Sequence, residues 1–202
     1  MPEPFSRVFP VDPCARRGVD ANRTVLHQQL AKEEIPTRIH LMDAKKSITL
    51  LNKAVADELQ AVHQYMYWHF HLDDQGFAPL SMMLKRIAIQ EMGHVEILAD
   101  RILFLKGDVE MVAAGPVEKI TEAQDILAKA AEMEQAGVQS YNQAALECSQ
   151  NADAVSKQLF EQLVQDEEIH FDEFDKQLDN IKRFGPSYLA LQSFTKTPEQ
   201  PA

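Results

Sequence analysis

The chain is poor in cysteine and has no long apolar run, and each shortage excludes a class of protein. Its two cysteines, Cys14 and Cys148, lie far apart and outside any Cys-x-x-Cys pattern, so no zinc, rubredoxin or disulfide signature is present. A reducing compartment is the simplest inference. No apolar stretch approaches the roughly 20 residues that span a bilayer. The first residues do not match a secretory signal, so we expect a cytoplasmic protein.

Glycine and positive charge are also scarce. The 202 residues include only seven glycines and few β-branched runs, which favours helix over strand. The formal net charge is −11, which disfavours a phosphate-binding surface and favours attraction of cations. We therefore expect an all-α protein that attracts cations and does not bind DNA.

Proline separates an N-terminal extension from the rest of the chain. Residues 1–40 hold five of the ten prolines, with six Lys or Arg residues against five Asp or Glu residues, so the acidic excess lies further along. A short helix over 21–34 and an arm along the surface are both open for this segment. We expect three parts: an extension at 1–40, a helical bundle at 41–184, and a short helix with a tail at 185–202.

Four long helical patterns follow the extension, with no strand alternation of useful length. The expected helices are about 43–72, 79–106, 121–148 and 152–183, with a short fifth helix at 187–194. Two of the links are a few residues long, which predicts two antiparallel hairpins. The link at 107–120 can span roughly 46 Å at about 3.3 Å per residue, enough to run back along the bundle. Gly107 is the expected left-handed residue after the second helix.

Six Glu and His residues fall at spacings that fit a two-metal site. Two Glu-x-x-His pairs occur, and a lone Glu precedes each pair by 33 positions. Residues three apart on a helix share one face, and the lone Glu residues lie mid-helix, so four helices can deliver ligands at one depth. The candidate metal ligands are Glu58, Glu91, His94, Glu134, Glu167 and His170.

The chemistry of these side chains suits iron or manganese, since carboxylate oxygen and imidazole nitrogen bind both. Four carboxylates also offset the charge of two divalent cations, which makes burial tolerable. A single Glu-x-x-His is usually a solvated surface pair. Two such pairs at the same offset from an upstream Glu, with apolar neighbours around Glu58 and Glu91, favour the metal interpretation.

Three segments carry a resemblance to a known family: LLNKAVADELQAVHQY, IAIQEMGHVEILADRILFLKGD and LVQDEEIHFDEFDKQLDNIKRFGPSYL. Over about residues 45–194 the chain resembles the bacterioferritins, within the ferritin-like di-iron superfamily. The ligand spacings of 33, 43 and 33 match as well. The resemblance implies a ferritin-like four-helix bundle with one long crossover, in which two helices give one Glu each and two give Glu-x-x-His.

The resemblance also implies a function. Bacterioferritins are ferroxidases that oxidise ferrous iron with oxygen or peroxide and store ferric mineral in a hollow cage of 24 subunits. By position, Glu58 and His94 would serve one iron, and Glu134 and His170 the other. The two remaining ligands, Glu91 and Glu167, would bridge.

Two further residues match family positions. Tyr65, seven residues after Glu58, matches a tyrosine near the di-iron site that can donate an electron; a core tyrosine with a satisfied hydroxyl is the alternative. Met92 matches the methionine that ligates haem b at a two-fold subunit interface. Packing in that interface without haem is the alternative for Met92.

Two other functions stay open on the same bundle. One is a Dps-like miniferritin, a dodecamer that uses peroxide to protect against oxidative stress. The other is a manganese catalase or a rubrerythrin-type peroxidase. The expected short fifth helix resembles the one near the cage four-fold axis, which favours 24 subunits over 12. Particle mass, metal content and oxidant preference distinguish these readings.

Overall fold

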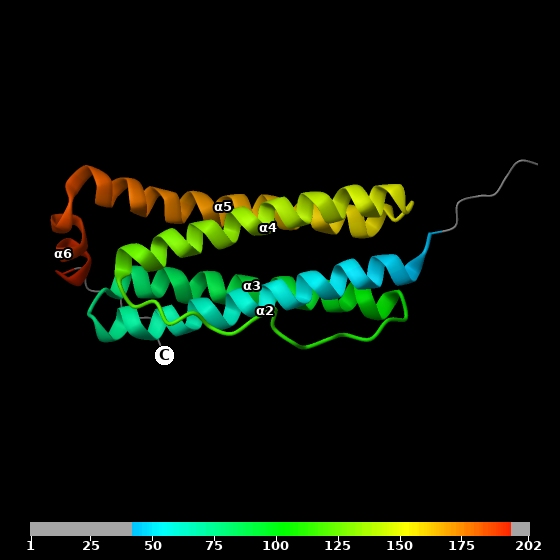
Figure 1. The fold of residues 1–202 in the computed structure, drawn as a ribbon, viewed down its shortest axis with the longest axis horizontal. Helices are drawn as coiled ribbons and strands as arrows, with labels where there is room; N and C mark the ends of the chain where they lie inside the picture. The colour runs from blue at the N-terminus through cyan, green and yellow to red at the C-terminus, as the bar shows by residue number, and fades with distance from the viewer. Residues whose placement is uncertain (1–41, 195–202) are drawn as a thin grey trace, which may run out of the picture. The chain divides into compact units, whose positions relative to one another are not determined.

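The computed structural model describes residues 42–194, which form four long helices and one short one (Figure 1). In chain order the helices are α2 (Ala44–Asp74), α3 (Ala78–Phe104), α4 (Ala123–Gln150), α5 (Ala154–Phe184) and α6 (Pro186–Phe194). The all-α, ferritin-like fold class expected from the sequence is confirmed. The expected helix over 21–34 lies outside the described residues, and the division into three parts stays a prediction.

Side-chain caps explain where two of the long helices, α2 and α5, begin. The Asp43 carboxylate accepts a hydrogen bond from the backbone N–H of Lys45 and so satisfies a free donor in the first turn of α2. Asp153 does the same for Ser156 at the start of α5. Asp153 also accepts a 2.6 Å hydrogen bond from Arg101 of α3, so this cap fixes the start of α5 beside the end of α3.

The end of α3 corrects one expectation. The left-handed residue after the helix is Lys106, with φ 64°, and not Gly107. Gly107 is needed for a different reason: a Cβ there would lie 2.9 Å from the side chain of Ile48 in α2. The glycine therefore permits close approach of the chain to α2, which local sequence does not reveal.

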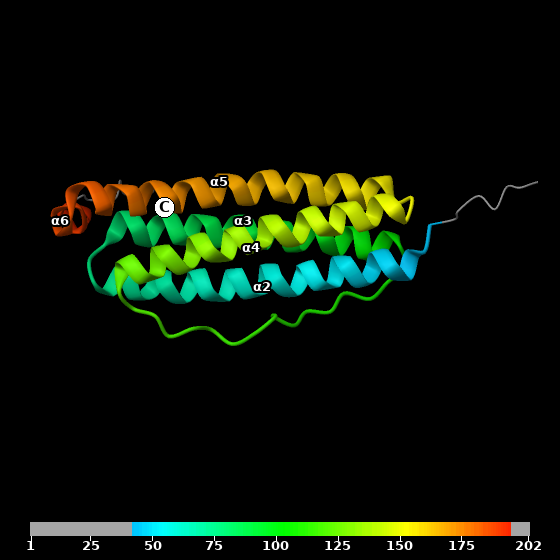
Figure 2. The ribbon, with the colours of Figure 1, turned by 45° about the horizontal axis from the view of Figure 1, so that its top comes forward.

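The long link between α3 and α4 runs back along α2, as its length predicts (Figure 2). Four amide side chains in or just after α2 hydrogen-bond to the backbone of this crossover: Asn52, Gln60, Gln64 and Gln75. The last of them donates to the carbonyl of Thr121 at 2.8 Å, just before α4 begins. The crossover thus places the start of α4 beside the start of α3, and α2–α3 and α4–α5 form the two hairpins.

The apolar core is divided into two clusters. One contains Leu51, Val55, Leu98 and Phe160. The other contains Trp68, Leu84, Ile126 and Phe174, nearer the other end of the bundle. Between them lies a layer of buried charged side chains. None of the described helices combines the length and apolarity that a membrane span requires.

Candidate metal centre

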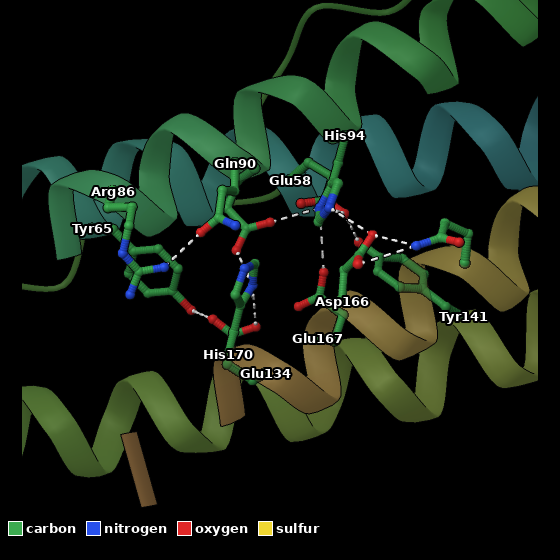
Figure 3. Close-up of polar contacts among 12 residues, drawn as sticks. Glu58, Tyr65, Arg86, Gln90, His94, Glu134, Tyr141, Asp166, Glu167 and His170 are labelled. Atoms are coloured by element: carbon green, nitrogen blue, oxygen red, sulfur yellow. Dashed lines mark hydrogen bonds and ion pairs between the residues drawn. The ribbon is translucent and has the colours of Figure 1, made fainter. Parts of the chain in front are cut away.

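The charged layer consists of the six side chains singled out by their spacing. None of them is more than 7 % exposed, although four are glutamates. Each of the four long helices contributes, and Figure 3 shows the labelled ligands converging between the helices. Buried carboxylates at this density need compensating positive charge, because burial of an isolated ion is costly.

The ligand atoms form two overlapping groups, within each of which they lie within 4.8 Å of one another. The first group is Glu58, Glu91, His94 and Glu167; the second is Glu91, Glu134, Glu167 and His170. Glu91 and Glu167 belong to both groups. This sharing matches the expectation that these two residues bridge two metal ions, while each remaining Glu and His serves one ion.

Glu91 lies between the two histidines. Its Oε2 is 2.8 Å from Nδ1 of His94, and its Oε1 is 2.9 Å from Nδ1 of His170. The His94 and His170 rings face each other with centroids 6.0 Å apart. Both histidines therefore direct Nδ1 to the middle of the centre, and Nε2 is the outer nitrogen of each ring.

Several atoms of the centre are buried without a hydrogen bond. They are both carboxylate oxygens of Glu91, Oε1 of Glu167, and Nδ1 of His94 and of His170. A buried polar atom without a hydrogen bond is destabilising, and a metal ion coordinated at this point satisfies such atoms. The donor set and its orphaned atoms therefore fit two iron or manganese ions.

The protonation of the centre reflects this crowding. Burial raises the pKa of Glu58 to about 8, although the nearby His94 ring acts to lower it. Burial, together with a hydrogen bond and repulsion involving Glu134, also raises the pKa of Glu167 strongly. Burial alone would raise the pKa of Glu91, but the close contacts with His170 and His94 and the positive charge of both rings lower it to about 2. Without metal, bound protons thus supply part of the positive charge that the metal cations would supply.

The pKa values of the two histidines shift in the direction opposite to the effect of burial. Burial alone would lower the pKa of each, but neighbouring glutamates raise both values to about 10. For His94 the glutamates are Glu58 and Glu91, and for His170 they are Glu134 and Glu91. Each imidazole must lose its proton to coordinate a metal, so binding releases protons.

Two tyrosines hold the lone glutamates. The Tyr65 hydroxyl donates to Oε1 of Glu134, and the Tyr141 hydroxyl donates to Oε1 of Glu58 at 2.7 Å. Burial, followed by the nearby glutamate charges, raises the pKa of both tyrosines well above the usual value, so both hydroxyls stay donors. Sequence reasoning missed Tyr141. The signal was present, because Tyr141 follows Glu134 by the same seven residues that separate Tyr65 from Glu58.

A pocket of about 330 Å³ between α2 and α4 leads to the centre. Its lining includes Glu58, Glu134 and Glu167 at the inner end. Lys53 donates a 2.8 Å hydrogen bond to Ser140 and so joins the two helices beside this pocket.

Met92 lies apart from the centre. Its side chain is 37 % exposed on α3, although Met92 stands between two ligands in the sequence. Exposure there is consistent with both the haem and the interface interpretations, so the role of Met92 stays a prediction.

Comparisons with known proteins agree with this geometry. The Ferritin family model, described as a ferritin-like domain, matches residues 48–184. Bacterioferritin from Desulfovibrio desulfuricans is 37% identical over 145 residues, covering 72% of this chain and 81% of that protein. Bacterioferritin from Rhodobacter capsulatus is 35% identical over 147 residues, covering 72% and 91%.

A solved structure extends the likeness to three dimensions. The X-ray structure of the Desulfovibrio desulfuricans bacterioferritin, described with its diiron site in different catalytic states, superposes with a TM-score of 0.76. The sequence identity is 35%, and the match covers 79% of this chain and 93% of that chain. The match is thus to a nearly complete bacterioferritin subunit.

Proposed function

Because the chain belongs to the bacterioferritins and its buried carboxylate–histidine centre is a di-iron ferroxidase site, we propose that it oxidises Fe(II) there and stores the ferric product in a cage of its own copies. The observation that carries the proposal is the pair of overlapping ligand groups that share Glu91 and Glu167. One chain supplies every ligand of both groups, so the site is complete within a subunit.

The residues of the chain account for binding in physical terms. The four glutamates provide the negative charge that two Fe(II) ions neutralise, and the two Nδ1 atoms complete the donor set. Bound iron supplies the electrons that reduce oxygen or peroxide. Protons displaced from the centre leave when iron enters, because the groups that hold them at neutral pH are the ligands themselves.

The apolar clusters on either side restrict water and fix the ligand helices. Leu59 and Val95 belong to one cluster, and Ala88 and Ala131 to the other, each within a turn of a ligand. A rigid surround keeps the ligands in place as charge at the centre changes. We propose that the pocket between α2 and α4 is the route by which Fe(II) reaches the centre from outside the bundle.

The assembly and the remaining roles are also proposals. We propose a cage of 24 copies in the cytoplasm, supported by the coverage of nearly whole bacterioferritin chains and by the short helix α6. We further propose that Tyr65 donates an electron during oxidation, supported by its hydrogen bond to Glu134. Met92, exposed on α3, is proposed to ligate haem b between two subunits.

A kinetic experiment tests the ferroxidase proposal. Metal-free protein receives increasing Fe(II), and stopped-flow absorbance follows oxidation by oxygen and, separately, by peroxide. The expected result is a fast phase whose amplitude saturates at two Fe(II) per subunit, one for each ligand group. A fast phase with peroxide alone, in a particle of 12 subunits, would instead support the hypothesis of a miniferritin. Oxygen release from peroxide by a manganese-loaded protein would support the hypothesis of a catalase.

A further inference from the structure

The two halves of the centre have the same ligands but differ at the residue just before each Glu-x-x-His pair. Each half of the chain supplies a lone Glu, a Tyr seven residues later, and a Glu-x-x-His pair. The residue just before the Glu of each pair breaks this repeat. It is Asp166 in α5 and Gln90 in α3.

Asp166 lies on the outer side of His94. Its Oδ2 is 3.5 Å from His94 Nε2, the nitrogen that faces away from the centre (Figure 3). The Gln162 amide donates to both oxygens of Asp166, at 3.2 and 3.1 Å, and so fixes the carboxylate. A carboxylate behind a metal-binding histidine keeps the proton on the outer nitrogen and makes the inner nitrogen a better ligand.

The equivalent position in the other half has no such charge. Gln90 is a neutral amide, and its Oε1 accepts a 3.0 Å hydrogen bond from Nη1 of Arg86. The same guanidinium pairs with Glu173 of α5 (Figure 3). Among residues 42–194, His170 makes its two ion pairs through Nδ1, with Glu91 and Glu134. A carboxylate thus lies behind the His94 imidazole, whereas the residue at the matching sequence position in the other half, Gln90, is an amide bound to a cation.

We propose that the two metal positions are unequal: the position served by Glu58 and His94 binds a divalent cation before the position served by Glu134 and His170. Asp166 is the positioning residue that makes the difference, acting through His94. The inference rests on the proposed di-iron function and deepens it. Outer partners of metal-binding histidines change affinity about 10- to 100-fold, which sets the expected difference between the two positions.

A titration with Co(II) alone tests the proposal, because the visible absorption of bound Co(II) reports binding without any oxidation. The metal-free full chain is expected to bind two equivalents per subunit in two distinguishable phases. Asp166→Asn is expected to weaken the first phase about 10- to 100-fold and leave the second in place. Gln90→Asp, which copies the other half, is expected to strengthen the second phase.

Two ligand variants identify which position fills first. His94→Ala should remove the tight phase, whereas His170→Ala should retain it. Glu168→Gln is the matched control for Asp166→Asn, because it removes an exposed carboxylate from the same turn of α5 and should leave both phases unchanged. Far-UV circular dichroism of every variant verifies that the helices are intact.

The outcomes separate the two proposals. Two equivalents of equal affinity in the native chain, or a tight phase that survives Asp166→Asn undiminished, would overturn the unequal positions and leave the di-metal centre standing. Failure of the native chain to bind two equivalents would overturn the proposed function itself. A tight phase lost in His170→Ala but kept in His94→Ala would overturn the assigned order.

Discussion

The hydroxyl of Tyr141 in α4 donates a 2.7 Å hydrogen bond to Oε1 of Glu58 in α2, across the buried centre. Tyr65 makes the reciprocal bond from α2 to Glu134 in α4. Each tyrosine thus orients the lone glutamate of the opposite hairpin. The second oxygen of Glu134, Oε2, lies 3.7 Å from Nδ1 of His170.

We predict that Tyr141→Phe weakens metal binding at the Glu58 position by about tenfold, because the carboxylate loses the donor that fixes its rotamer. Loss of the bond leaves a buried acceptor and lowers the free energy of unfolding of the metal-free protein by about 1–3 kcal/mol. Calorimetric titration with Co(II) and urea unfolding measure the two effects. Tyr65→Phe is the matched variant, with the loss at the Glu134 position; equal binding in both variants and the native chain would contradict the orienting role.

Gly137 in α4 permits close approach of Glu167. A Cβ at this position would lie 3.2 Å from Oε2 of Glu167, so Gly137→Ala must displace that carboxylate by a few tenths of an ångström. We expect weaker metal binding, with the helix itself favoured by up to about 1 kcal/mol because alanine replaces glycine. Ala136→Gly, at the exposed neighbouring position, is the control. It should destabilise α4 by a similar amount and leave metal binding unchanged.

The pH dependence of the metal-free protein follows from the raised pKa values. His94 and His170 titrate at about 10 in the folded protein against 6.5 as the ordinary value, so their stabilisation is complete below pH 6.5 and is lost as the pH rises toward 10. Glu58, raised from 4.5 to about 8, acts in the same direction. Glu91, lowered from 4.5 to about 2, stabilises above pH 4.5 and loses this effect as the pH falls toward 2.

We therefore predict that the thermal midpoint of the metal-free protein falls between pH 6.5 and pH 10. Metal binding requires the histidines to lose their protons, so the gap between metal-bound and metal-free midpoints should widen over the same range. Differential scanning calorimetry of both forms measures the gap, and the comparison cancels the general repulsion of an acidic chain. A gap that narrows as the pH rises would refute the prediction.

The sequence predicted the helices and the six ligands because both depend on local spacing. Glu91 and His94 share a helix face whatever surrounds them, and a period near 3.6 residues marks each long helix. The partner of Tyr141 was not predictable in this way, since Glu58 lies 83 residues away and meets it only after the hairpins pack. The predicted position of the left-handed residue was wrong by one, since Lys106 and not Gly107 has positive φ. The glycine at 107 is required by the nearby side chain of Ile48 and not by the end of α3.

Asp166 is a second residue whose role could not be predicted from the sequence. Its place next to Glu167 was visible in the sequence, but its function depends on α5 packing against α3 so that the carboxylate lies beside His94. Residues that bind metal directly can thus be predicted from their spacing in the sequence. The residues that orient those ligands can be identified only in the packed structure.

The role of Met92 has a spectroscopic test. If Met92 ligates haem, the protein expressed with adequate haem shows a Soret band, and Met92→Leu removes it. Met111→Leu, at an exposed methionine of the crossover, is the control and should keep the band. A native protein without the band under these conditions would leave Met92 as an interface residue only.

The most direct test of the centre is an anaerobic Fe(II) titration of the metal-free protein by calorimetry. Glu91 is shared by both ligand groups and contacts both histidines, so the native chain should bind two Fe(II) per subunit and Glu91→Ala should abolish this stoichiometric binding. Glu96→Gln, an exposed site on the same helix, is the control and should bind as the native chain does. Unchanged binding of two Fe(II) by Glu91→Ala would contradict the account.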